Sequence, residues 1–134
     1  MADFTCIVVT PEATVLEEKT SFVALPLHDG EKGIGPNHAP LIARLGCGEL
    51  RLKTESGETT RLYVDGGFVQ ISDNTVSVLT DRAMPSTEVN EEAARDLLET
   101  AKTQKAASDE QIDAREKTIN QARAQIRVAQ RGKK

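Results

Sequence analysis

The residues best suited to chemistry lie in one short stretch, GIGPNHAPL at residues 33–41, which combines two glycines, two prolines and a histidine. A glycine-rich loop can bind a phosphate, a histidine can transfer protons, and a stiff loop can contact another protein. Outside this stretch the chain has one further histidine, His28, and two cysteines. These few residues limit the chemistry that the chain can do.

Neither common phosphate-binding pattern is present. A Walker loop needs GxxxxGK followed by serine or threonine, because its backbone N–H groups surround the phosphate. The stretch lacks that lysine and hydroxyl, and Pro36 removes one N–H donor. A dinucleotide-binding turn needs a third glycine opening a helix, where Ala39-Pro40 stands instead. The sequence therefore predicts no phosphate-binding loop here.

Catalysis and metal binding at His38 also lack support. There is no GxSxG motif, and no cysteine or aspartate lies at a zinc-ligand spacing from His28 or His38. Cys6 and Cys47 lack CxxC spacing, and we expect buried free thiols, which fits a reducing compartment. We expect no catalytic residue, no metal and no cofactor. We expect His38 to bond to backbone or to a partner.

The elements that position this loop are predicted to be strands. Short β-branched and apolar runs recur roughly every 8–12 residues between Gly, Asp and Asn turns, a pattern typical of an antiparallel sandwich or barrel. No helical pattern separates them, which disfavours a parallel α/β sheet. Asp65-Gly66-Gly67 is interpreted as a bulge or tight corner. The runs are 4–10, 21–27, 47–54, 59–64, 68–72 and 75–80.

From residue 85 onward the composition changes to Ala, Glu, Gln, Lys and Arg, which favour helix. We expect one helix to begin at Thr87 or Asn90 and a second near Ser108. Apolar residues at helical and heptad-like spacing predict two amphipathic helices joined as an αα-hairpin. The two stripes are Val89, Ala93, Ala94, Leu97, Leu98 and Ala101, then Ile112, Ile119, Ala122, Ile126 and Ala129.

The predicted fold class is therefore α+β, with an N-terminal antiparallel β-sandwich at residues 1–84 and a C-terminal helical hairpin at 85–134. The stripes are rich in alanine, which buries little apolar area at about 25 cal/mol per Å². We expect the hairpin to be only marginally held to the sandwich and able to adopt more than one position.

Charge is unevenly distributed. The net charge is −4, yet residues 108–134 carry seven basic and four acidic side chains. Arg123 and Arg127 are four residues apart and share a helix face. No aromatic residue accompanies them, so an acidic protein surface suits them at least as well as nucleic acid. For any single charge a solvated helix face is the simpler interpretation. The basic residues are Arg115, Lys117, Arg123, Arg127, Arg131, Lys133 and Lys134.

The N-terminal MADFTCIVVT has no basic segment, and no window approaches the roughly 20 apolar residues of a membrane span. We expect a protein that is soluble or peripheral to a membrane.

Three segments together resemble one family, the epsilon subunit of bacterial and chloroplast F-type ATP synthase. GIGPNHAPLIARLGCGELRL resembles the family's G-I-x-P-x-H-x-P-L region. VDGGFVQISDNTVSVLTDRA resembles its second signature, a Gly-Gly-Phe strand followed by a hairpin. AQIRVAQ at 124–130 is similar to its second C-terminal helix. The resemblance covers nearly the whole chain in the same order.

The resemblance implies a flattened sandwich of about ten strands at the foot of the central stalk. His38, Pro40 and Leu41 would contact the gamma subunit, and Glu31 and Lys32 would contact the c-ring. The subunit would do no bond chemistry itself. It would help couple c-ring rotation to gamma during proton-driven ATP synthesis. It would contact the membrane only through the complex, on the cytoplasmic side of a bacterial plasma membrane or the stromal side of a thylakoid.

The resemblance also implies a regulatory role for the hairpin. In bacterial relatives it extends along gamma and inhibits ATP hydrolysis by presenting basic residues to the beta subunit. Arg115, Arg123 and Arg127 are the candidates here, and the alpha and beta subunits would then be further partners.

The chain departs from the family at a nucleotide-binding motif. Some relatives bind ATP through I-D-x-x-R-A at the start of the first helix. The corresponding run is VNEEAA at 89–94, with Asn90 for the aspartate and Ala93 for the arginine. Arg95 lies two positions later, about 200° around the helix. Because arginine is the natural bidentate partner of a phosphate, we expect weak or absent ATP binding.

A second hypothesis is a free-standing β-domain whose basic helical tail binds an acidic partner or nucleic acid. It predicts salt-sensitive association with DNA or RNA and no affinity for gamma. An enzyme is a third hypothesis, and it would need a cofactor pocket that this aromatic-poor sequence does not indicate.

Overall fold

Strict alternation along the first strand shows how the sandwich is built. In β1 (Phe4–Val9), the side chains of Phe4, Cys6 and Val8 are buried, and those between them are only half-buried. Successive side chains of a strand point to opposite faces, so one face of β1 lies on the core. The structure, a computed structural model, describes residues 3–131 of the chain.

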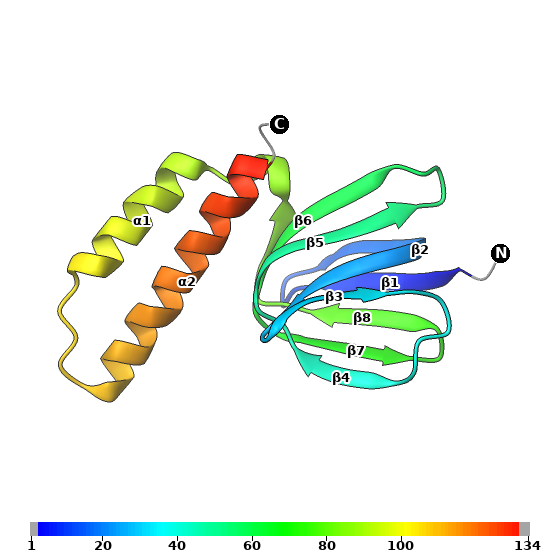
Figure 1. Cartoon of the computed structure of the whole chain (residues 1–134), viewed down its shortest axis with the longest axis horizontal. Helices are drawn as coiled ribbons and strands as arrows, with labels where there is room; N and C mark the ends of the chain where they lie inside the picture. The colour runs from blue at the N-terminus through cyan, green and yellow to red at the C-terminus, as the bar shows by residue number, and fades with distance from the viewer. Residues whose placement is uncertain (1–2, 132–134) are drawn as a thin grey trace.

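The described residues form nine strands in one sheet (Figure 1). The strand order is β4-β7-β8-β1-β2-β5-β6-β9, and β3 pairs with β2. After β1 the strands are β2 (Thr14–Leu27), β3 (Gly30–Ile34), β4 (Leu41–Arg44), β5 (Cys47–Thr54), β6 (Thr59–Asp65), β7 (Phe68–Ser72), β8 (Thr75–Leu79) and β9 (Ala83–Pro85).

The predicted β-sandwich followed by a helical hairpin is confirmed, with one difference in strand direction. All described strand pairs are antiparallel except β1 and β8, which run parallel from Thr5↔Thr75 to Val9↔Leu79. A parallel pair joins strands that no tight turn can connect, and these two are far apart in the sequence. Local sequence patterns therefore carried no signal for this pairing.

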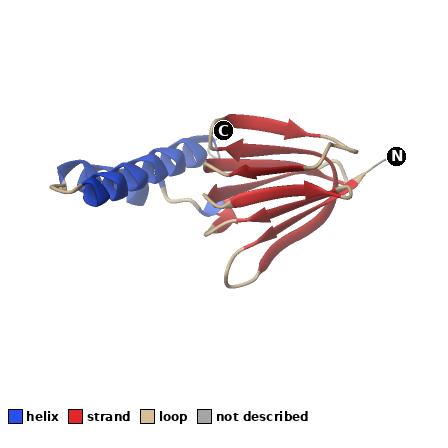
Figure 2. Cartoon of the chain, turned by 90° about the horizontal axis from the view of Figure 1, so that it is seen from below, coloured by secondary structure: helices blue, strands red, loops and turns tan. Residues whose placement is uncertain are grey.

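The long strand β2 belongs to both layers of the sandwich. Its first half pairs with β1, and its second half pairs with β3 and β5. Its register with β5 shifts between Thr20 and Val23, where the Thr20 hydroxyl lies within hydrogen-bond distance of the carbonyls of Phe22 and Lys53. A bulge bends a strand, so the sheet folds back over a core of Val, Leu and Ile side chains (Figure 2).

The hairpin begins directly after the last strand. A 3₁₀ turn, η1 (Ser86–Glu88), leads into α1 (Glu91–Thr103), and α2 (Asp109–Arg131) follows. Asn90 is the N-cap of α1, because its side-chain oxygen accepts from the Ala93 N–H at 3.0 Å. The Ser108 hydroxyl accepts from the Gln111 N–H at 3.1 Å at the start of α2.

Most of the predicted apolar stripe of α2 is buried, while its first member, Ile112, is 38% exposed, and Leu97 on α1 is 37% exposed. The helices pack on each other, and α2 lies between α1 and strands β5 and β6 (Figure 1). The predicted basic residues Lys133 and Lys134, together with Gly132, lie outside the described residues.

Candidate interaction surfaces

The predicted gamma-contact loop lies at the end of the sandwich away from the helices (Figure 1). Asn37 is in the left-handed region with φ 61°, and its N–H donates to Asn74 Oδ1 at 3.0 Å. This bond ties the loop to the turn between β7 and β8. His38 is half-buried, with Nδ1 2.7 Å from the Ala39 carbonyl oxygen. His38 therefore bonds to backbone, which is one of the two expected arrangements.

The remaining loop candidates have different surroundings. Pro40 is exposed, whereas Leu41 is half-buried and packs against the sandwich core. The predicted c-ring residues, Glu31 and Lys32, lie on exposed positions of β3, at the end nearer the β2–β3 turn. Glu31 Oε1 accepts from an Arg51 guanidinium nitrogen at 2.6 Å. The structure thus separates the Glu31–Lys32 pair from the His38 loop along β3.

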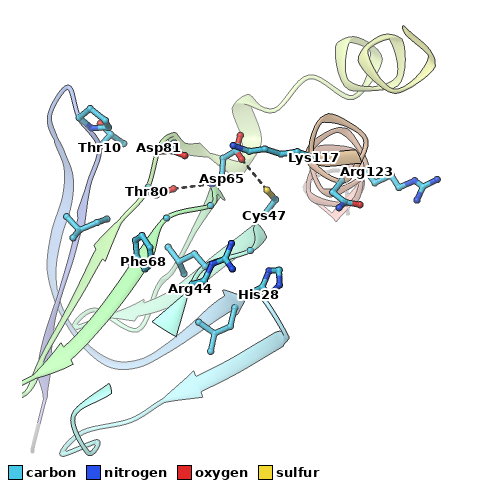
Figure 3. Close-up of a pocket in the computed structure, with 18 of the residues that line it drawn as sticks. Thr10, His28, Arg44, Cys47, Asp65, Phe68, Thr80, Asp81, Lys117 and Arg123 are labelled. Carbon is cyan, nitrogen blue, oxygen red and sulfur yellow. Dashed lines mark hydrogen bonds between the residues drawn. The ribbon is translucent and has the colours of Figure 1, made fainter. Parts of the chain in front are cut away.

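A groove of about 1310 Å³ lies between the helix-facing end of the sandwich and α2 (Figure 3). His28 in the β2–β3 turn and Arg44 on β4 line it from the sandwich, and Lys117, Arg123 and Arg127 line it from α2. The last two are exposed and were predicted as inhibitory residues.

Arg115, the third predicted inhibitory residue, does not line this groove. One of its guanidinium nitrogens donates to the Gln104 carbonyl at 3.2 Å, at the C-terminal end of α1. The structure therefore brings Arg123 and Arg127 together and places Arg115 at the far end of the hairpin, where it stabilises the connection between the helices.

A polar cluster lies where α2 meets the ends of β5 and β6 (Figure 3). Asp65 Oδ1 accepts from Gln121 Nε2 at 2.9 Å and from the Cys47 thiol at 3.1 Å. Beside it, Tyr63 forms a small apolar contact with Ala124 and Val128 of α2. The docked position of α2 thus combines a few hydrogen bonds with a small apolar area.

Neither cysteine is a reactive thiol in this arrangement. Burial raises the pKa of Cys6 to about 12. Burial, and then the hydrogen bond to Asp65, raise the pKa of Cys47 to about 12. Both cysteines are free, but Cys47 is only half-buried, unlike the expected buried thiol, because it is the first residue of β5, at the end of the strand that lies under α2.

The raised thiol pKa values predict a loss of stability at alkaline pH. A thiol whose pKa rises from 9.0 to about 12 on folding stabilises the fold below pH 9, and this contribution disappears as the pH approaches 12. We expect the urea midpoint of the natural chain to fall between pH 8 and pH 11 by more than that of a Cys6→Ala/Cys47→Ala variant. Urea unfolding followed by circular dichroism at each pH gives the midpoints of both proteins. Equal falls would contradict the prediction.

An exposed apolar surface covers the outside of three neighbouring strands. Ile42 on β4, Phe68 on β7 and Leu79 on β8 are 72%, 53% and 51% exposed. Phe68 is directly opposite Leu79, and Arg44, two residues after Ile42, is opposite Phe68, so all four point to the same face. We call Ile42, Phe68 and Leu79 the outer apolar face.

Sequence reasoning missed this face, although a signal was present. Each strand has adjacent apolar residues, as in Leu41-Ile42, Phe68-Val69 and Val78-Leu79. One residue of each pair must point away from the core. Such pairs therefore mark either a second buried face or an apolar surface.

Neither a metal site nor a membrane-spanning helix is found in the described part of the chain. Within residues 3–131 no three His, Cys, Asp or Glu side chains are grouped to hold an ion. No described helix is long and apolar enough to cross a membrane.

Residues 3–86 match the family model of the ATP synthase delta/epsilon chain, beta-sandwich domain. The ATP synthase epsilon chain of Rhodopirellula baltica is 44% identical over 124 residues, covering 92% of this chain and 96% of that protein. The chain belongs to the ATP synthase epsilon-chain family. It is accordingly a non-catalytic subunit of the ATP synthase complex. This family membership replaces the hypotheses of a free-standing binding module and of an enzyme.

Other members of the family extend the same similarity over the hairpin. The epsilon chain of Desulfitobacterium hafniense strain Y51 is 41% identical and covers 93% of each chain. The sodium-ion-specific epsilon chain of Propionigenium modestum is 33% identical, covering 97% of this chain and 96% of that protein.

Solved structures show the same fold at lower identity. A chain of the Euglena gracilis mitochondrial ATP synthase, from a structure of OSCP, F1 and the c-ring, superposes with a TM-score of 0.82 at 20% identity, covering 92% of this chain and 79% of that one. A chain from a structure of the Tetrahymena thermophila mitochondrial ATP synthase central stalk and c-ring superposes with a TM-score of 0.73 at 17% identity. The match covers 93% of this chain and 95% of that one.

Proposed function

We propose that this epsilon subunit works in the rotor, where it couples rotation of the c-ring to the gamma subunit during proton-driven ATP synthesis. The outer apolar face carries this proposal, because a large exposed apolar surface usually marks a site of protein–protein contact. The names of the similar structures, an F1/c-ring assembly and a central stalk with its c-ring, support the choice of partners.

The gamma subunit is the proposed occupant of the outer apolar face. Ile42 follows the predicted contact residues His38, Pro40 and Leu41 directly in the sequence, so the contact loop leads into this face. Leu41 contributes by packing inward, which fixes Ile42 in its outward position. Arg44 provides a charged neighbour beside the apolar centre, as is usual for protein interfaces.

The c-ring contact is proposed at Glu31 and Lys32. Both side chains are exposed, and the ion pair of Glu31 with Arg51 limits the positions that its carboxylate adopts. The subunit would reach the membrane only through the c-ring, on the cytoplasmic side of the bacterial plasma membrane.

We also propose that the hairpin, taken as residues 85–134, inhibits ATP hydrolysis when it extends toward the alpha and beta subunits. Arg123 and Arg127 are exposed on α2 and have no ion-pair partner among the described residues. Arg115 would become available only when the helices separate, because it now bonds to Gln104.

We propose weak or no ATP binding at the start of α1. The Asn90 side chain is occupied as the N-cap, and Arg95 forms an ion pair with Glu91 at 2.9 Å. No arginine occupies position 93, where the family motif has one.

Replacing Phe68 with aspartate tests the gamma contact. We expect the affinity for an F1 complex lacking this subunit to fall by at least roughly tenfold, because aromatic side chains at the centre of interfaces often contribute most of the binding free energy. The dissociation constants are measured from the binding of each purified subunit to F1 immobilised on a surface.

Phe22→Asp is the matched control. Phe22 is 43% exposed on β2, outside the outer apolar face. The Phe22→Asp variant should therefore bind F1 as tightly as the natural chain does. Equal affinities of the Phe68→Asp variant and the natural chain would exclude this face as the gamma contact, provided that both variants keep the circular dichroism spectrum of the sandwich.

A further inference from the structure

One buried carboxylate contacts both ends of the hairpin. The Glu49 side chain on β5 is 1% exposed. Its Oε1 lies 3.0 Å from an Arg61 guanidinium nitrogen, 3.8 Å from one of Arg131 and 3.9 Å from one of Arg51. Its Oε2 accepts from the Ser86 hydroxyl at 3.1 Å. Every polar partner of this carboxylate is thus either a guanidinium or a hydroxyl donor.

These partners belong to two parts of the molecule. Arg51 and Arg61 are directly opposite each other on β5 and β6, so they remain with the sheet in any position of the hairpin. Ser86 begins the turn that leads into α1, and Arg131 is the last residue of α2. Glu49 therefore connects the sheet to the segment where the hairpin starts and to the residue where it ends.

The carboxylate also lies beside the apolar contact of α2. Glu49 is directly opposite Tyr63 across β5 and β6, and Tyr63 packs against Ala124 and Val128. A buried carboxylate is costly without partners, and removing one partner of a buried charge is strongly destabilising. The charge-assisted hydrogen bond from Arg61 and the nearby positive charges of Arg51 and Arg131 offset that cost.

From this geometry we propose that Glu49, Ser86 and Arg131 form a latch that determines how often the hairpin leaves the sheet. With α2 docked, Glu49 has all of its partners and no access to water. With α2 released, Glu49 loses Ser86 and Arg131 but becomes hydrated and keeps Arg51 and Arg61. The carboxylate is stabilised in both positions, so the latch biases an equilibrium between two states rather than locking one of them.

Alkylation of Cys47 measures release of the hairpin on the isolated chain. Cys47 packs under α2, and its thiol donates a hydrogen bond to Asp65 Oδ1. The same oxygen accepts a hydrogen bond from Gln121 of α2. Release exposes this thiol. Cys6 is fully buried in the sandwich core and reacts only on global unfolding, so it is an internal control in the same molecule.

We expect Arg131→Gln to increase the rate of Cys47 alkylation by N-ethylmaleimide at neutral pH by about three- to tenfold, the effect of losing one charge-assisted contact. The Cys6 rate should not change. Arg127→Gln removes the same charge one helical turn earlier, from an exposed side chain without an ion-pair partner in the described residues, and should stay within about twofold of the natural chain. Mass spectrometry of the two cysteine peptides gives both rates.

The pairing is tested by combining variants. In a Glu49→Gln background, Arg131→Gln should no longer change the Cys47 rate, because the charge that it contacts is gone. If Glu49→Gln does not fold, Ser86→Ala provides the second measurement and should also increase Cys47 alkylation. Equal Cys47 rates in the natural chain, Arg131→Gln and Ser86→Ala would overturn the latch.

The consequence for the complex rests on the proposed inhibitory function. Arg131→Gln should lower the ATPase activity of reconstituted F1, since a released hairpin is the inhibitory one. Faster Cys47 alkylation with unchanged ATPase activity would support the latch and contradict the inhibitory role. An unchanged alkylation rate would contradict the latch whatever the ATPase activity.

Discussion

Alanine at position 67 should destabilise the sandwich by more than about 3 kcal/mol, enough to unfold much of the protein at moderate temperature. Gly67 has φ 105°, a region that alanine rarely adopts, and a Cβ built there lies 1.9 Å from the Leu79 carbonyl oxygen and 2.8 Å from the Thr80 Cα. Both are backbone atoms, so no side-chain rotation relieves the overlap.

The surrounding bonds show why the backbone cannot move aside. The Gly67 carbonyl accepts from the Leu45 N–H at 2.9 Å, and the next residue, Phe68, pairs with Leu79. Shifting the chain at this corner would therefore break the start of β7 away from β8. The sequence-based interpretation of Asp65-Gly66-Gly67 as a tight corner identified the turn but did not distinguish the two glycines.

Gly66→Ala is the matched control. Gly66 also has a positive φ, 71°, but a Cβ there meets only Asp81 Oδ2 at 3.8 Å. Gly66→Ala should lower the free energy of unfolding only by the cost of a left-handed backbone at alanine, about 1–2 kcal/mol. Urea unfolding followed by circular dichroism compares the two free energies of unfolding. If the variants are equally stable, the close approach of Gly67 to β8 is not what requires glycine there.

Both helices and six of the strands were predictable because their signals are local, whereas no predicted run corresponds to β3, β4 or β9. Alternating apolar residues marked β1, β5 and β8. Capping residues marked the helix starts at Ser108 and at either Thr87 or Asn90, of which Asn90 is the N-cap. In each case the residues that form the element also specify it. The parallel pairing of β1 with β8 depends on strands about seventy residues apart, and no local pattern encodes it.

The interaction residues were harder to predict because their surroundings are tertiary. In the run CGELRLKT, the alternation of a strand puts Glu49 and Arg51 on the face opposite Leu50. Alternation does not indicate what covers that face, where Ser86 before α1 and Arg131 at the end of α2 both contact the Glu49 carboxylate. The same reasoning explains Arg115, whose helical position is predictable but whose bond to Gln104 depends on how the two helices pack.

Glutamate at position 124 should separate the hairpin from the sheet without unfolding the sandwich. Ala124 is 1% exposed and lies in an apolar contact with Tyr63 and Val128, so a carboxylate at this position would be buried among apolar side chains. Burying an unpaired charge costs several kcal/mol. This exceeds the free energy by which the small apolar contact of two α2 side chains stabilises the docked helix. Release of α2 is therefore the less costly response.

Two measurements distinguish this outcome from unfolding. Alkylation of Cys47 should become more than roughly tenfold faster, while Cys6 stays protected, since only the former lies under α2. Ala114→Glu adds the same charge to an exposed position of the same helix and should leave both rates unchanged. If Cys6 reacts together with Cys47, the sandwich depends on the docked hairpin, and the two parts do not behave as separate units.

The same variant tests the proposed inhibition most strongly, because it shifts the hairpin further than loss of Arg131 alone. Reconstituted F1 with Ala124→Glu should hydrolyse ATP more slowly than F1 with the natural subunit, and adding Arg123→Gln/Arg127→Gln should restore much of the rate. These two arginines remain on the released helix but no longer face the groove of the sandwich. A slower rate that the arginine substitutions do not restore would mean that the released hairpin inhibits by occupying space, not through its charge.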